Sequence, residues 1–185
     1  MGPSVILHDQ RLDGAIDSGV HPVIRVDETT PLVDAFRQVV AAVTRSGSDL
    51  IIACHGFMTH EYGEASNLAP WGGQGLQLCS ETLRVRNISA VAPLRGHFQT
   101  IWLMACGPAG TFVHPSRPFC REFAFHADAV VIASDTAQQY HAGEYDNARA
   151  VSRRALRFGA WEGSVFAFRP DGTVRPYTKD VRPLP

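Results

Sequence analysis

Two stretches decide the fold of this chain: IIACHG, residues 51–56, and IWLMACG, residues 101–107. Each begins with an apolar run in which no polar residues alternate, a pattern typical of a parallel strand covered on both faces. Each contains a reactive side chain followed by glycine, His55 in the first stretch and Cys106 in the second. Because active sites of such sheets form beyond the carboxyl ends of the strands, we expect His55 and Cys106 to meet at one edge.

Strands and helices alternate outward from these two segments. We expect strands over residues 5–8, 23–26, 50–54, 76–79, 100–105 and 129–133, and helices over 32–43, 87–95, 118–126 and 145–157. A final hairpin is expected around Asp171-Gly172. The alternation predicts an α/β fold, a three-layer α/β/α sandwich with a mostly parallel central sheet.

The helix expected over residues 32–43 has the clearest pattern. Thr30 is its expected N-cap, Pro31 occupies the first helical position and Gly47 ends it. Its apolar stripe, at the 3.6-residue period, comprises Leu32, Val33, Phe36, Val39, Val40 and Val43. We expect this stripe to pack on the sheet.

Length and composition indicate one folded domain. The chain has 185 residues, 45% of them hydrophobic, which is enough for one compact core and short for two. We expect a single domain over residues 1–185, with its core over about 20–160 and the C-terminal hairpin over about 161–178. The net charge of −1 creates no global field, so neither nucleic acid nor a membrane is expected as a partner.

The sequence also suggests a compartment. No apolar stretch approaches the ~20 residues that a membrane-spanning helix needs, and no basic segment followed by an apolar one begins the chain. Four cysteines in a chain of this length are too sparse for a disulfide framework. We therefore expect a cytoplasmic protein with reduced thiols.

The residues at the two strand ends suit attack on a carbonyl carbon. A free thiol is only a few per cent thiolate at neutral pH, so an adjacent histidine that accepts its proton activates it. The tetrahedral oxyanion that forms needs preorganised N–H donors, and we expect the backbone groups of Gly56 and Cys106 to supply them. Gly107 leaves the Cys106 side chain unshielded and is a candidate substrate contact.

This arrangement resembles a known family. A helix, an apolar strand ending in His-Gly, a short strand with Gly-Leu-Gln-Leu, a helix and an apolar strand ending in Ala-Cys-Gly follow one another. The order is similar to that of the caspase-like cysteine peptidases, which include caspases, gingipains, clostripain and separase. The resemblance is closest to bacterial CHAT-type domains and extends from Leu32 to Asp135. It implies that His55 is the catalytic base and Cys106 the nucleophile.

The chain also departs from that family's patterns. Around the nucleophile it has MACGP, residues 104–108, where caspases carry a Gln-Ala-Cys-Arg-Gly type of motif. The resemblance therefore implies no preference for aspartate. Members that cleave after arginine or lysine carry an acidic residue in the specificity pocket, and Asp135 is the candidate for this position. An ordinary helix N-cap is the alternative interpretation of Asp135.

Simpler interpretations exist for each residue. Taken alone, Cys106 is most often an inert buried thiol and His55 a loop histidine. Cys54 precedes His55 on a strand, so its side chain should point to the opposite face and belong to the core. Cys79 and Cys120 are also interpreted as structural. His60, Tyr62 and Glu64 follow the first strand end, where solvated loop residues are the simpler interpretation. Glu122 and His126 have the spacing of a surface pair on a helix. No Cys-x-x-Cys, His-x-x-x-His or P-loop pattern occurs, so we expect neither a metal nor a cofactor.

The sequence thus favours a cysteine endopeptidase of caspase-like fold that hydrolyses a peptide bond through a thioester acyl-enzyme. Its expected partner is a peptide or protein substrate, and an activating protein partner is left open. Two alternatives remain: a catalytically silent caspase-like binding or regulatory module, and a non-peptide acyl hydrolase that uses the same dyad.

Overall fold

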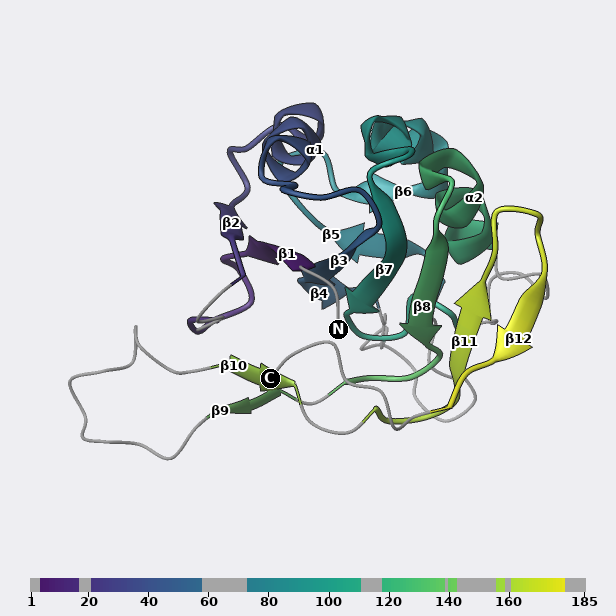
Figure 1. Cartoon of the computed structure of the whole chain (residues 1–185). Coiled ribbons are helices and arrows are strands. Elements are labelled where there is room, and N and C mark those ends of the chain that lie inside the picture. Colours follow the sequence, from purple (N-terminus) through teal and green to yellow (C-terminus); the bar gives the residue numbers. More distant parts are fainter. Residues whose placement is uncertain are drawn as a thin grey trace.

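A seven-stranded sheet forms the centre of the molecule (Figure 1). The computed structural model describes residues 4–16, 21–57, 73–110, 118–138, 140–142, 156–158 and 161–178. In spatial order the strands are β2 (Val23–Val26), β1 (Ser4–Asp9), β3 (Ser48–Ala53), β7 (Phe98–Met104), β8 (Val130–Ser134), β11 (Val165–Phe168) and β12 (Val174–Pro176). The first five strands are parallel and the last two are antiparallel to their neighbours. The expected α/β fold with a mostly parallel sheet is confirmed.

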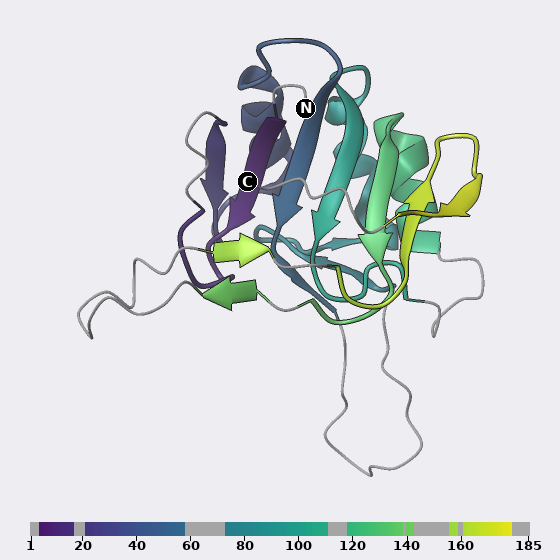
Figure 2. The ribbon, with the colours of Figure 1, turned by 60° about the horizontal axis from the view of Figure 1, so that its bottom comes forward.

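The carboxyl ends of the parallel strands meet at one edge, which lies at the bottom of Figure 2. A small antiparallel sheet lies at this edge, formed by β4 (His55–Gly56), β5 (Gly75–Gln77) and β6 (Leu83–Arg84). A separate two-stranded antiparallel sheet pairs β9 (Tyr140–Ala142) with β10 (Leu156–Phe158). The chain continues from β3 directly into β4, so the small sheet extends the main sheet at the edge where His55 lies.

The three helices of the described residues cover the same face of the sheet (Figure 1). They are α1 (Leu32–Ala41), the 3-10 helix η1 (Val85–Leu94) and α2 (Pro118–Ala127). Crossovers between parallel strands are right-handed, and those from β2 to β3, β3 to β7 and β7 to β8 all run in one direction across the sheet. They therefore place their helices on one side. A second helical layer is not among the described residues.

The connection from β1 to β2 runs in the opposite direction, so the same rule places it on the other face. Leu12 and Ile16 of this connection pack there with Trp102 and Trp161. Trp102 also contacts Tyr177 edge-on, with ring centroids 5.6 Å apart. The second face is thus covered by loop side chains where the structure describes it.

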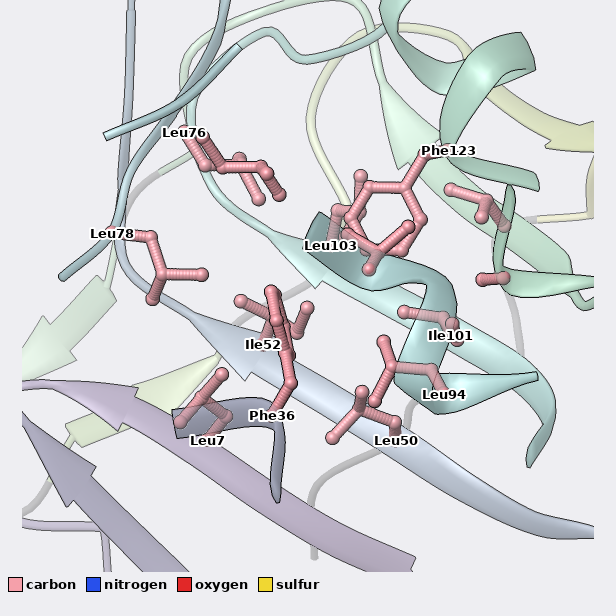
Figure 3. Packing of buried hydrophobic residues seen from close by; sticks show 14 of the residues in the cluster. Leu7, Phe36, Leu50, Ile52, Leu76, Leu78, Leu94, Ile101, Leu103 and Phe123 are labelled. Carbon is pink, nitrogen blue, oxygen red and sulfur yellow. The ribbon is translucent and has the colours of Figure 1, made fainter. Parts of the chain in front are cut away.

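Strict alternation along the strands divides the core. In β3, Leu50 and Ile52 point to the helix side, whereas Ile51 and Ala53 point to the other face. Figure 3 shows the helix side, where Phe36 of α1 lies over β3 among buried leucine and isoleucine side chains. Both faces are apolar at every central position, which explains why the two decisive segments contain no polar alternation.

Several sequence predictions need correction in detail. Helix α1 ends at Ala41, and its N-cap is Pro31, which has extended backbone dihedrals, while the Thr30 hydroxyl donates to Asp27. The first free N–H of the helix, on Leu32, instead donates to the Glu81 carboxylate at 2.8 Å. Within the stripe, Val33 is 40% exposed.

Two other predicted helices also differ from the structure. The one expected over 87–95 is the 3-10 helix η1, in which Pro93 lacks the N–H for a regular ladder and Asn87 departs from helical dihedrals. The helix expected over 145–157 is wrong at its end, because Leu156–Phe158 form β10. The rest of that prediction lies outside the described residues. No helix within the described ranges is long and apolar enough to cross a membrane.

The packing of α1 generates the first prediction. Phe36 is fully buried and Val33 is 40% exposed on the same helix. Phe36→Ala should lower the free energy of unfolding by about 3–5 kcal/mol, because it opens a cavity in the core. Val33→Ala should change it by less than about 0.5 kcal/mol. Urea unfolding of both variants measures the difference, and equal effects would contradict the placement of α1.

Candidate active site

The strand pairing brings the two predicted catalytic residues to the same edge of the sheet. Ala53 and Met104 are register partners in the parallel β3–β7 ladder. The ladder continues one step further, where the Cys54 N–H donates to the Met104 carbonyl at 3.4 Å. His55 and Cys106 each lie two positions beyond the paired residues, at the same edge.

Gly56 and Cys106 touch through their backbones. A methyl group on Gly56 would lie 2.8 Å from the backbone nitrogen of Cys106 and closer still to its carbonyl oxygen. No side chain fits in this space, so glycine is required here for steric reasons. The contact places the two N–H groups predicted to form the oxyanion hole on adjacent segments of chain.

The pairing of β4 with β5 also orients Gly56. The Phe57 N–H donates to the Gly75 carbonyl at 3.5 Å, so Phe57 occupies a hydrogen-bonding position opposite β5. N–H groups alternate in direction along a strand, which turns the N–H of Gly56 away from β5. This direction is compatible with the predicted role of Gly56 as a donor to a substrate oxyanion.

His55 is exposed, and its ring is held by a backbone carbonyl. The Nε2 atom lies 3.0 Å from the carbonyl oxygen of Arg11, in the turn that follows β1. A carbonyl oxygen only accepts hydrogen bonds, so Nε2 carries the hydrogen. In the neutral ring Nδ1 is then the unprotonated nitrogen, the one able to take a proton.

The thiol of Cys106 is half-buried and lies against the peptide group of Gln138. The Gln138 N–H donates to Sγ at 3.4 Å, and the thiol can donate to the Gln138 carbonyl at 3.7 Å. The Gln138 peptide group therefore fixes where the Cys106 sulfur lies.

The buried Gln138 side chain fixes that peptide group. Its amide nitrogen donates to the Ser134 hydroxyl at 2.9 Å and to the Glu162 carbonyl at 3.1 Å. Its amide oxygen accepts the Glu162 N–H at 3.1 Å. Gln138, after β8, is thus hydrogen-bonded to Glu162, before β11, and the Gln138 peptide group contacts the nucleophile.

Gly107 adopts a left-handed conformation, with φ of 58°, and is buried. Its N–H donates to the Thr136 carbonyl at 2.8 Å, and its carbonyl accepts the N–H groups of Gly73 and Gly110 at 2.8 and 2.9 Å. Its observed role is to turn the chain after the nucleophile. The expectation that Gly107 contacts substrate stays a prediction.

Asp135 connects β8 to the start of β11. Its carboxylate accepts the Ser164 N–H at 2.9 Å, and its own N–H donates to the Ser164 carbonyl at 3.1 Å. No helix follows it in the described residues 135–138, so the alternative role as an N-cap is not observed. Whether the carboxylate also contacts substrate stays a prediction.

The other three cysteines belong to the core, as predicted. Cys54, Cys79 and Cys120 are buried, and burial raises the pKa of Cys79 to about 12 and that of Cys54 well above its ordinary value. Among the described residues no group of three or more potential ligands could hold a metal ion. His60, Tyr62 and Glu64 lie outside the described residues. Glu122 and His126 form the expected surface pair, 3.8 Å apart.

Sequence reasoning did not identify two parts of the site, the Arg11 carbonyl and the Gln138 peptide group. Both are backbone groups, so residue type carries no direct signal for them. Their position does carry a signal, because each group lies in the segment that follows a parallel strand, β1 or β8. Comparison with known proteins adds no further residue: no family model matches the chain, and no match is found among curated proteins.

The contact between Gly56 and Cys106 generates a prediction. Gly56→Ala should destabilise the fold by more than about 3 kcal/mol, because the new methyl group meets backbone that cannot move aside easily. Gly96→Ala is the matched control, since its methyl group enters open space and costs only about 1 kcal/mol for its φ of 78°. Chemical denaturation of both variants tests this, and similar losses would show that the Gly56 contact is not tight.

Another prediction concerns His8, which is buried beside the turn that holds His55. Its Nε2–H donates to the Leu12 carbonyl at 2.9 Å, and its Nδ1 atom has no partner among the described residues. Burial lowers the pKa of His8 below its ordinary value of 6.5, and the charge of Arg25 adds to this.

Below pH 6.5 the unfolded chain therefore binds a proton at His8 that the folded chain does not. The free energy of unfolding should fall as the pH drops from 6.5 towards the folded pKa, by at most about 1.4 kcal/mol per pH unit for this proton. His8→Gln should lack this component. Urea unfolding at pH 7.5, 6.5 and 5.5 measures it, and identical pH dependence in both proteins would contradict it.

Proposed function

We propose that this chain is a cysteine endopeptidase of caspase-like fold, with His55 as general base and Cys106 as nucleophile. The observation that carries the proposal is the convergence of three parallel-strand ends on one edge. The segment after β1 holds the His55 ring, β3 supplies His55, and β7 supplies Cys106. A histidine with a defined proton-accepting nitrogen and a thiol at the same edge of the sheet are the two groups that nucleophilic catalysis requires.

The three-layer architecture is part of this proposal. The parallel strands lie in the order β2-β1-β3-β7-β8, the doubly wound order in which the chain reverses direction between β1 and β3. Ligands bind at such a reversal point, and both Arg11 and His55 lie there.

In the proposed reaction the Cys106 thiol gives its proton to Nδ1 of His55, and the resulting thiolate attacks the carbonyl carbon of the substrate. The carbonyl π electrons move onto oxygen, which the N–H groups of Gly56 and Cys106 stabilise. The C–N bond then breaks as the protonated His55 delivers its proton to the leaving amine. A thioester with Cys106 and a free amine result.

Hydrolysis of the thioester uses the same groups. His55 takes a proton from water, and the hydroxide oxygen bonds to the carbonyl carbon. The C–S bond then breaks as the protonated His55 returns its proton to the sulfur, which releases the carboxylic acid and the thiol. The Arg11 carbonyl keeps Nε2–H in place through both halves, so Nδ1 remains the nitrogen that exchanges protons. The thiol must leave the Gln138 carbonyl before it meets the ring.

Activity of purified variants tests the proposal. Cys106→Ala should abolish hydrolysis of peptide and protein substrates, and His55→Ala should lower kcat/KM by about 10²- to 10⁴-fold. His126→Ala is the matched control, because that histidine lies in a surface pair on α2 and should leave kcat/KM unchanged. Labelling with a thiol-directed acyloxymethyl ketone should occur on Cys106 in the wild type and be lost in Cys106→Ala.

Equal labelling of the wild type and Cys106→Ala would reject the dyad. Labelling without peptide hydrolysis would reject the endopeptidase and, with turnover of small acyl esters, indicate a non-peptide acyl hydrolase. Absence of both labelling and turnover would indicate a silent binding module.

A further inference from the structure

Asp9 is the last residue of β1, and its carboxylate is fully buried next to the candidate site. A buried carboxylate is costly unless hydrogen bonds and an opposite charge compensate it. Asp9 makes such contacts with two residues, Arg11 and Cys79. No step of the proposed reaction uses this carboxylate, so the structure must hold it for another reason.

Three of the four hydrogen bonds of the Asp9 carboxylate come from Arg11, in the turn that follows β1. Oδ1 accepts the backbone N–H of Arg11 at 3.1 Å and its Nε–H at 2.8 Å, while Oδ2 accepts Nη2–H at 2.6 Å. Oδ2 also accepts the Cys79 N–H at 2.8 Å. Burial acts to raise the pKa of Asp9, but these hydrogen bonds outweigh it and hold the pKa below 3.8. The carboxylate is therefore ionised at neutral pH.

Both the guanidinium group and the backbone of Arg11 are held by hydrogen bonds. Its guanidinium forms a two-pronged pair with Asp9 and donates to the Cys79 carbonyl at 3.0 Å. Its backbone N–H is held by the same carboxylate, and the next N–H, that of Leu12, donates to the Asp9 carbonyl at 3.0 Å. The Arg11 carbonyl lies between these two fixed N–H groups, and it is the group that binds Nε2–H of His55.

We propose that Asp9 is a positioning residue for His55: by fixing the turn at Arg11, it aims the carbonyl that keeps the proton on Nε2, so that Nδ1 is the nitrogen that can take a proton from Cys106. Asp9 touches neither substrate nor the reacting atoms. It acts through Arg11, and this role rests on the proposed function of the dyad. Contacts from Asp9 to Arg11 and from Arg11 to His55 thereby link a buried charge to the orientation of an exposed ring.

The geometry of the Asp9–Arg11 ion pair supports a role in orientation. A two-pronged arginine–carboxylate pair adds directional rigidity that a single ion pair lacks. The exposed pair Asp34–Arg37 on α1, with one contact at 3.2 Å, provides the contrast. Surface pairs of that kind contribute little. The Asp9 carboxylate instead accepts both guanidinium hydrogen bonds and the backbone N–H of Arg11. These contacts together restrict the backbone that carries the Arg11 carbonyl.

The experiment compares the wild type with Asp9→Asn, Arg11→Lys and the control Asp34→Asn. Nitrogen-15 NMR of the imidazole rings, with His55 assigned by its loss in His55→Gln, reports the tautomer and the exchange of Nε2–H with water. Asp9→Asn and Arg11→Lys should speed this exchange at least tenfold and lower kcat by about 10- to 100-fold with little change in KM. Asp34→Asn should change neither quantity.

Thermal unfolding establishes which variants are folded. If Asp9→Asn does not fold, Arg11→Lys decides the test, because the Arg11 side chain is 22% exposed and its carbonyl is retained. Unchanged Nε2–H exchange in a folded Asp9→Asn or Arg11→Lys variant overturns the role of Asp9. If the wild type shows no Cys106-dependent turnover but the exchange still changes, the proposed function fails while the positioning by Asp9 stands.

Discussion

The site depends on a steric constraint, the backbone contact between Gly56 and Cys106. Two parallel strands in register, β3 and β7, extend past the end of their ladder and stay close enough that no side chain fits between them. Strand neighbours in a sheet are about 4.8 Å apart, so chains leaving a sheet normally diverge to make room for side chains. Glycine at position 56 removes that need, and the reactive residues on either side of the contact are held at neighbouring positions.

Fixing two backbones side by side does not by itself orient the side chains. The ring of His55 is exposed and the thiol of Cys106 is half-buried, so neither is confined by packing alone. Each is held instead by a peptide group from another strand end: the Arg11 carbonyl after β1 for the ring, and the Gln138 peptide after β8 for the sulfur. The β3–β7 pair thus supplies the reactive groups, and the two flanking strands supply the groups that direct them.

The parts of this design that the sequence predicts are those with a hydrophobic pattern or a reactive side chain. Apolar runs predicted β3, β7 and β8 because both faces of each strand are buried in the two core clusters. The short strands β4 and β6 have two residues each and no period to detect. Val33 was placed in the core because it fits the helical stripe, but its side chain is 40% exposed.

The orienting groups could not be predicted for a different reason. A backbone carbonyl such as that of Arg11 is present at every residue, and only the tertiary fold decides which one meets His55. Asp9 and Gln138 are polar residues in buried positions, a departure from local expectation that tends to mark functional sites, but one sequence does not show which polar residues are buried.

The distribution of buried polar residues explains how the sheet keeps a stable core and a precise edge. Through the middle of the sheet both clusters are apolar, so the hydrophobic effect stabilises the strands without specifying the loops. Among the described residues, four of the six buried polar side chains lie at or just beyond the carboxyl ends of β1 and β8, namely His8, Asp9, Ser134 and Gln138, whereas Ser4 and Ser48 begin β1 and β3. Burying such groups costs free energy unless each hydrogen bond has defined geometry, so the loops that satisfy them have few alternative conformations. The cost of burial is therefore concentrated where a fixed loop geometry determines how His55 and Cys106 are presented.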